Sequence, residues 1–347
     1  MIKVEKHGVI IAKTSHGFES EGVMNPAVIE HEGEIYVFYR AVSKGNYSSI
    51  GFCKLSDPLT VSFRQETPLL FPQLEIESHG MEDPRVVKID DLFYFTYTAY
   101  DGVNALGALA LSDDLVNFKK QGVIVAKITY EEFSHLAGSK DIINDKYLRF
   151  NKPAVGLQYR QNELYVWDKN VIFFPRRIKG KLCFIHRIRP DIQVVYITSL
   201  TDLTLVFWQH YYLHLSDNIL LMPKYAHEYS YIGGGCPPLE TALGWLLIYH
   251  SVTDSLEGYI YVACAALLDL ENPQKEIGRL PLPLFKPEKF WELKGEVNNV
   301  CFPTGMIKRN DTLYIYYGAA DEQIACVSVS LSALLQELLL NKATYEN

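Results

Sequence analysis

A segment repeated five times along the chain is the feature that most constrains its fold. Each copy begins at or beside a proline, passes through a polar turn into an aromatic run, and continues into a second apolar run. Alternating runs rich in aromatic and β-branched residues are typical of β-strands. Sheets repeated around an axis leave only short protected edges. We therefore predict an all-β chain forming a five-bladed β-propeller, a single domain over residues 1–347. The copies are NPAVIEHEGEIYVFYRA from Asn25, EDPRVVKIDDLFYFTYTAYDG from Glu82, FPRRIKGKLCFIHRIRP from Phe174, PPLETALGWLLIYHSV from Pro237 and FPTGMIKRNDTLYIYYGAAD from Phe302.

The sequence predicts two features outside the regular repeat. The second and third copies lie further apart than the others, which places an insertion around residues 120–170, expected as a loop over one face. Near the C-terminus, leucines recur with helical spacing and predict a short helix packed outside the blades. These leucines are Leu334, Leu335, Leu338 and Leu339.

Composition excludes several classes of function. The formal net charge of −8 argues against a general nucleic-acid binder, which needs a surplus of Lys and Arg. No apolar run approaches the length of a membrane span, and the first residues lack the features of a signal peptide, so we expect a cytoplasmic protein with no membrane partner. The six cysteines include no C-x-x-C pair and are expected to be buried free thiols. The ten histidines show no tight ligand spacing, so no metal is expected.

Two columns of the aligned repeat contain the candidate functional residues, because the inner strands of a propeller converge on its central channel. The column before the repeat proline has one ionisable member, Asp83. Its carboxyl group could deliver a proton, or it could bond its own backbone at the entry to a strand. The residues alone leave both roles open. This column reads Asn25, Asp83, Phe174, Pro237 and Phe302. The aromatic column reads Tyr39, Tyr97, His186, Tyr249 and Tyr317, and the next position reads Arg40, Thr98, Arg187, His250 and Gly318.

The segment HGMEDPRVVKIDDLFYFTYTAYDG, together with the first, fourth and fifth copies, is similar to glycoside hydrolase family 130. That family comprises β-mannoside phosphorylases and some β-1,2-mannosidases. The resemblance extends over roughly residues 20–335. It implies a propeller with a central active site and no cofactor. In it, Asp83 would be the general acid, acting through a mannose hydroxyl while inorganic phosphate attacks the anomeric carbon with inversion.

The resemblance also implies a set of substrate-binding residues. Asn25, Arg40, Arg85 and Asp321 fall in matching motifs and would contact sugar or organise the funnel. Asp101, in the A-Y-D-G stretch, and His250 complete the predicted set. Two of these residues have simpler alternatives, because Arg85 could pair with Glu82 or Asp83, and Asp321 could close a turn.

The nature of the attacking group is left open between phosphate and water. Phosphorolysis needs cationic donors, and the basic third copy offers His186, Arg187 and Arg189 as phosphate ligands. Against this, Leu106 stands where many phosphorylases of the family would have a basic residue. An inverting β-1,2-mannosidase, with Glu240 or Glu228 activating water, is therefore the main alternative. A non-catalytic carbohydrate- or protein-binding propeller is the third.

The expected partner is a β-linked manno-oligosaccharide or mannosyl-disaccharide, with inorganic phosphate as co-substrate if the enzyme is a phosphorylase. The sequence does not decide the linkage, the acceptor sugar or the oligomeric state, and a homo-oligomer is compatible with it.

Overall fold

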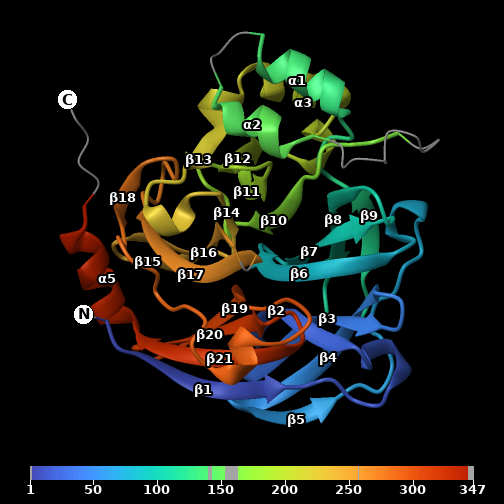
Figure 1. Cartoon of the computed structure of the whole chain (residues 1–347), viewed down its shortest axis with the longest axis vertical. Helices are drawn as coiled ribbons and strands as arrows, with labels where there is room; N and C mark the ends of the chain where they lie inside the picture. The colour runs from blue at the N-terminus through green and yellow to red at the C-terminus, as the bar shows by residue number, and fades with distance from the viewer. Residues whose placement is uncertain (1, 140–142, 153–162, 257, 343–347) are drawn as a thin grey trace.

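The computed structural model describes residues 2–139, 143–152, 163–256 and 258–342, and β-strands dominate it. The all-β prediction is confirmed. The strands form five antiparallel units, two of which are joined into one sheet by a single parallel bridge between Ser48 and Gly80. Figure 1 shows the units surrounding the centre of the molecule.

Four units follow one another along the chain, and the fifth combines both ends of it. The first unit contains β2 (Gly22–His31), β3 (Glu34–Ser43), β4 (Tyr47–Asp57) and β5 (Thr60–Arg64). The second contains β6 (Gly80–Ile89), β7 (Leu92–Tyr100), β8 (Ala105–Ser112) and β9 (Lys119–Val123). The third contains β10 (Lys169–Phe173), β11 (Leu182–Arg187), β12 (Ile192–Ile197) and β13 (Ile219–Leu221). The fourth contains β14 (Tyr231–Gly234), β15 (Leu239–Thr241), β16 (Gly244–Ser255), β17 (Gly258–Leu268) and β18 (Glu276–Arg279). The fifth contains β19 (Cys301–Arg309), β20 (Thr312–Ala319), β21 (Gln323–Ser330) and the N-terminal β1 (Val4–Ile11), which pairs with β21.

The core lies between neighbouring units, where large apolar side chains from adjacent sheets pack against one another. Burying each such side chain stabilises the fold by roughly 1.5–3 kcal/mol. All six cysteines are buried and free, as predicted. Ring pairs cross four of the unit boundaries: Phe38 with Phe95 at 5.5 Å between centroids, Tyr94 with Phe173 at 5.0 Å, Phe174 with Trp245 at 5.1 Å and Phe285 with Tyr317 at 5.2 Å.

A buried glutamate repeats in four of the five units and explains the aromatic column of the sequence. In each unit the tyrosine hydroxyl donates to the glutamate, and a cation from the outermost strand pairs with the same carboxylate. Each set of contacts therefore links the second strand of its sheet to the outermost strand. The sets are Glu19 with Tyr39 and Arg64, Glu77 with Tyr97 and Lys120, Glu228 with Tyr249 and Arg279, and Glu292 with Tyr317 and Lys6.

Five α-helices lie within the described residues. α1 (Tyr130–Ala137), α2 (Asp145–Phe150) and α3 (Leu205–Leu213) lie together beside the third unit (Figure 1). The short α4 (Phe290–Leu293) carries Glu292. The predicted C-terminal helix is α5 (Leu331–Leu340), which buries Leu334 and Leu338 against the fourth and fifth units. Helices α1 and α2 fall within the predicted insertion, of which residues 140–142 and 153–162 lie outside the described residues. No helix in the described ranges is both long and apolar enough to cross a membrane.

Candidate active site

In the first two units, the residue before the repeat proline lies in a β-bulge that turns its side chain toward the centre of the molecule. The register of β2 against β3 shifts between Met24 and Ala27, and that of β6 against β7 shifts between Glu82 and Arg85. Asn25 and Asp83 sit in these bulges with φ of 50°. This left-handed conformation is tolerated best by Gly, Asn and Asp. The local chain geometry thus favours the small polar residues that the site uses.

The third unit has the same bulge without a proline, which corrects the alignment predicted from sequence. The register of β10 against β11 shifts between Lys169 and Ile172, and Asn170 has φ of 56°. Asn170 is therefore the counterpart of Asn25 and Asp83, whereas Phe174 is a core residue packed on Trp245. In the fourth unit the inner strand β14 ends before Pro237, so Pro237 is not a member of this column either.

These bulges line a central cavity of about 180 Å³. The cavity contains seven of the predicted site residues: Asn25, Arg40, Asp83, Arg187, Arg189, His250 and Asp321. Sequence reasoning missed Trp167, Lys169, Asn170, Tyr231, Tyr261 and Val300, while Phe302 had been placed in a column but given no role. Lys169 and Asn170 could not be found by their motif, because no proline follows Asn170.

The position after the aromatic column faces the cavity wherever its side chain is long enough. Arg40, Arg187 and His250 pair across their strands with Met24, Lys169 and Gly233. The equivalent Thr98 is buried and short. The equivalent Gly318 leaves room for Asn25, since a Cβ there would lie 2.0 Å from Asn25 Oδ1.

Asp83 is held by an amide and two cations. Asn25 Nδ2 donates to Asp83 Oδ1 at 2.7 Å, and Arg40 Nη1 lies 3.8 Å from the same oxygen. Glu82 accepts from Arg40 Nη2 at 2.9 Å and from Lys169 Nζ at 3.1 Å, so its carboxylate fixes both cations beside Asp83. The arrangement sets the orientation and the charge of one carboxyl group.

The two aspartates of the cavity have pKa values moved in opposite directions. Burial alone would raise the pKa of Asp83, but the charges of Arg40 and Lys169 and the Asn25 hydrogen bond outweigh it and hold the pKa below its usual value. Burial raises the pKa of Asp321 to about 6, and the nearby Asp83 and Glu82 charges add to the rise against the opposing effect of Arg40. Carboxyl groups with separated pKa values are a mark of acid–base sites.

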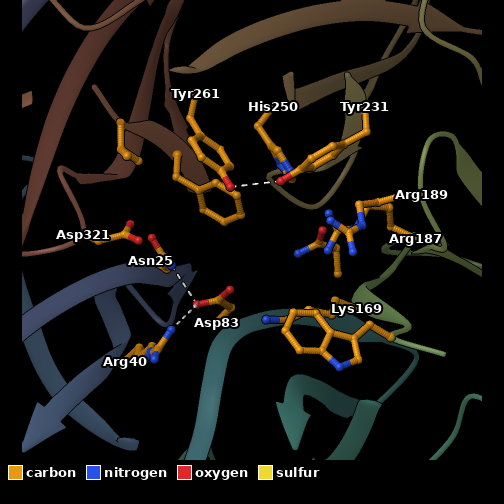
Figure 2. Close-up of a pocket in the computed structure, with 14 residues that line it drawn as sticks. Asn25, Arg40, Asp83, Lys169, Arg187, Arg189, Tyr231, His250, Tyr261 and Asp321 are labelled. Atoms are coloured by element: carbon orange, nitrogen blue, oxygen red, sulfur yellow. Dashed lines mark hydrogen bonds and ion pairs between the residues drawn. The ribbon is translucent and has the colours of Figure 1, made fainter. Parts of the chain in front are cut away.

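The opposite side of the cavity is cationic (Figure 2). Arg187 and Arg189 both stack on the ring of Tyr231, with Cζ 5.2 and 5.5 Å from its centroid. Neither guanidinium has an acidic partner within the described ranges of the chain. Burial, together with the charge of Arg189, lowers the pKa of Arg187. Two adjacent cations without a carboxylate are the donor set of an anion site.

Aromatic rings and unpaired polar atoms form the rest of the wall. Tyr231 and Tyr261 share a hydrogen bond of 2.9 Å between their hydroxyls, and Phe302 lies 4.3 Å from the ring of His250. Burial, with the charges of Arg187 and Arg85, lowers the pKa of His250 well below its usual value, so this ring is neutral. Three buried cavity atoms have no hydrogen-bond partner within the part of the chain that the structure describes: Asn25 Oδ1, Asn170 Oδ1 and Arg187 Nε. Such atoms are expected where a polar ligand binds.

His186 does not reach the cavity, which corrects its predicted role as a phosphate ligand. It is fully buried, with Nδ1 2.8 Å from Asp168 Oδ1 and Nε2 2.8 Å from the Tyr211 hydroxyl. It replaces the column tyrosine in the third unit, and both ring nitrogens are already used, Nδ1 by Asp168 and Nε2 by Tyr211 of α3.

Arg85 and Asp101 also lie outside the cavity lining. The fully buried Arg85 donates from Nε to Gly235 O at 2.5 Å and from Nη1 to Asp83 O at 3.0 Å, so it ties the Asp83 bulge to the fourth unit. Asp101 accepts from the main-chain N–H groups of Val103 and Asn104 at 2.8 and 2.6 Å and closes its own turn. The contacts of Arg85 fit its second predicted role, which is to organise the funnel, whereas Asp101 does not line the cavity.

The two glutamates considered for activating water are placed elsewhere as well. Glu240 is on the surface, where it pairs with Arg176 at 2.9 Å. Glu228 is the buried glutamate of the fourth unit. It lies near His227 and Cys264 in a group that could in principle hold a metal ion. Its oxygens already accept hydrogen bonds from Tyr249, Arg279 and the main chain. Leu106 is a buried core residue that forms a bridge with Asp168. The residue after Asp168 is Lys169, which lines the cavity.

Carboxyl groups thus face guanidinium groups across an aromatic-walled cavity, an arrangement that suits a carbohydrate-active enzyme. A family model described as beta-1,4-mannooligosaccharide phosphorylase matches residues 9–155 and 145–339. The chain belongs to this family, glycoside hydrolase family 130.

Two relatives match most of the chain, and a solved structure shares its fold. The 1,2-beta-oligomannan phosphorylase of Thermoanaerobacter sp. strain X514 is 30% identical over 93% of this chain and 96% of its own length. The beta-1,2-mannobiose phosphorylase of the same organism is 31% identical over 89% of this chain and 90% of its own. The structure of the Listeria innocua beta-1,2-mannobiose phosphorylase in complex with beta-1,2-mannobiose has the same fold, with a TM-score of 0.73 and 23% identity over 98% of this chain and all of that one.

Proposed function

We propose that this chain is an inverting β-mannooligosaccharide phosphorylase, and that its five units are the blades of a single-domain propeller with the active site in the central cavity. The observation that carries the proposal is the pair Arg187 and Arg189, which face Asp83 across the cavity without acidic partners in the described ranges. Hydrolysis needs no such pair, whereas phosphorolysis requires cations beside the sugar.

In the proposed reaction, phosphate is held by Arg187 and Arg189, and Lys169 adds a third positive charge. A phosphate oxygen forms a bond to the anomeric carbon while the bond from that carbon to the glycosidic oxygen breaks. The proton carried by Asp83 passes to the glycosidic oxygen, directly or through a sugar hydroxyl. The products are α-mannose 1-phosphate and the shortened sugar, and no cofactor takes part.

The charges of the cavity link proton delivery to the presence of phosphate. The pKa of Asp83 is below its usual value in the free enzyme partly because of Lys169. A bound phosphate anion offsets that positive charge and repels the carboxylate, so it raises the pKa of Asp83. A larger fraction of Asp83 therefore carries the proton that the reaction needs once the attacking group is in place.

We propose β-1,2-linked manno-oligosaccharides as the substrates, because the relatives that match most of the chain are named for that linkage. Aromatic faces at Tyr231, Tyr261 and Phe302 suit the apolar faces of sugar rings. The orphan amide oxygens and the neutral His250 ring suit sugar hydroxyls, which can donate to them. The hydrolytic alternative is disfavoured because neither Glu228 nor Glu240 lies in the cavity.

The test is incubation with β-1,2- and β-1,4-mannobiose and their longer oligomers, with and without inorganic phosphate, followed by identification of the products. We expect mannose 1-phosphate from the β-1,2 series only when phosphate is present. Free mannose released at equal rates with and without phosphate would show a hydrolase. Turnover of the β-1,4 series alone would overturn the proposed linkage.

A further inference from the structure

Helix α2 belongs to the segment between the second and third units and packs directly behind the cationic side of the cavity. Its buried residue Tyr147 donates to Asp191 Oδ2 at 2.7 Å and accepts from Gln193 Nε2 at 2.9 Å. The Gln193 side chain also bonds both the N–H and the carbonyl of Ile188, at 2.7 and 2.8 Å. The helix is thus tied to the chain on both sides of Arg189.

The last turn of α2 contacts Arg189 itself at two places. Asn151 Nδ2 donates to the main-chain oxygen of Arg189 at 2.8 Å and, at 2.8 Å, to that of Tyr147. Arg189 Nη2 donates to the Phe150 carbonyl at 3.2 Å. These contacts hold both the main chain and the guanidinium of Arg189.

Two rings fix the plane of the same guanidinium. Arg189 Cζ lies 5.9 Å from the ring centroid of Phe150 and 5.5 Å from that of Tyr231. Phe150 and Tyr231 also pack edge to face, with centroids 6.3 Å apart. An isolated arginine would turn away from the like charge of Arg187. The ring of Phe150 and the carbonyl of the same residue oppose that movement.

We infer that Phe150 and Asn151 are positioning residues that hold Arg189 toward the bound phosphate, so that α2 sets the affinity of the enzyme for its anionic co-substrate. The inference rests on the proposed function. It assigns a role to a segment whose sequence contains none of the repeat motifs.

The experiment compares Phe150→Ala, Phe150→Leu, Phe150→Tyr and Asn151→Ala with Leu148→Ala, a control on an exposed side chain of the same helix. We expect the KM for phosphate to rise about 3- to 10-fold in Phe150→Ala, Phe150→Leu and Asn151→Ala, which corresponds to the loss of one cation–π contact or hydrogen bond. The KM for mannobiose and kcat at saturating phosphate should stay near wild type. Phe150→Tyr, which keeps the ring, and Leu148→Ala should retain the wild-type KM for phosphate.

Direct binding of inorganic phosphate, measured by calorimetry, separates the inference from the proposed function. A wild type that binds phosphate but forms no mannose 1-phosphate would overturn the proposed function and leave α2 testable through the dissociation constant. An unchanged dissociation constant in Phe150→Leu and Asn151→Ala would overturn the inference. So would an equal loss of affinity in Leu148→Ala, because the effect would then come from the helix in general.

Discussion

The side-chain amide of Asn25 donates to the carboxylate of Asp83 at 2.7 Å, across the boundary between the first and second units. The two residues occupy the same position in two copies of the repeat, and both have φ of 50°. One repeated bulge therefore supplies both the carboxyl group and the amide that orients it.

Replacing Asp83 by Asn should abolish phosphorolysis without unfolding the protein. Asn has the same size and tolerates the left-handed conformation, but it has no proton to deliver. We expect kcat to fall by about 10²- to 10⁴-fold, the usual contribution of general acid catalysis. Thermal unfolding within a few degrees of wild type would show that the loss is chemical, and retained activity would remove Asp83 from this role.

Gly318→Ala should disturb Asp83 indirectly, through Asn25. The new Cβ would lie 2.0 Å from Asn25 Oδ1, so the amide must rotate and its hydrogen bond to Asp83 is lost. We expect kcat to fall by about ten- to a hundredfold, since small misplacements in active sites have effects of this size. Gly17→Ala, where a Cβ would meet nothing within 4 Å, is the control and should retain wild-type kinetics. Equal kinetics in the two variants would contradict the orienting role of Asn25.

Arg187→Met should weaken phosphate binding more than sugar binding. Loss of a charge-assisted donor is expected to raise the KM for phosphate by about 10- to 100-fold. Arg176→Met removes a surface arginine paired with Glu240 and Glu271, and should change neither KM value. Initial rates over a matrix of phosphate and mannobiose concentrations would measure both constants. A larger change in the KM for mannobiose than in that for phosphate would place the anion elsewhere.

Glu228→Gln and Glu240→Gln should separate structural from catalytic roles. Glu228 is buried against Tyr249 and Arg279, so its change is expected to lower the free energy of unfolding by about 3–5 kcal/mol while the folded enzyme still forms mannose 1-phosphate. The exposed pair of Glu240 should contribute less than about 1 kcal/mol. Denaturant unfolding and product assays would check both variants. Loss of turnover with full stability in either would revive a role for that residue in activating water.

Asp191→Asn should stabilise the protein at neutral pH. Burial raises the pKa of Asp191 to about 6, so the native state binds its proton more tightly than the unfolded state does. This effect makes stability fall as pH rises from about 4 to about 6, and the full penalty persists above that window. We expect a gain of up to about 3 kcal/mol at pH 7.5 and a smaller gain at pH 5. Denaturant unfolding at the two pH values would measure both. A gain independent of pH would point to packing instead of charge.

The sequence determined the all-β class, the copies of the repeat and the bulge position of Asp83, because these depend on local patterns. Alternating apolar residues specify strands, and the X-Pro bulges of Asn25 and Asp83 show in the sequence because their prolines do. The position after the aromatic column was likewise predicted to face the centre, and it places Arg40, Arg187 and His250 in the cavity.

Only the tertiary structure decided which polar residues line the cavity and which stabilise the fold. His186 and Glu228 look catalytic in sequence, yet burial against Asp168 and Tyr249 uses up their hydrogen-bonding atoms. Lys169 and Asn170 lack a local signal, because their bulge contains no proline. Whether a charged group meets a ligand or another residue depends on contacts between strands far apart in the chain. The sequence pattern predicts which side chains point toward the centre, but the packing of the sheets determines which groups each side chain contacts there.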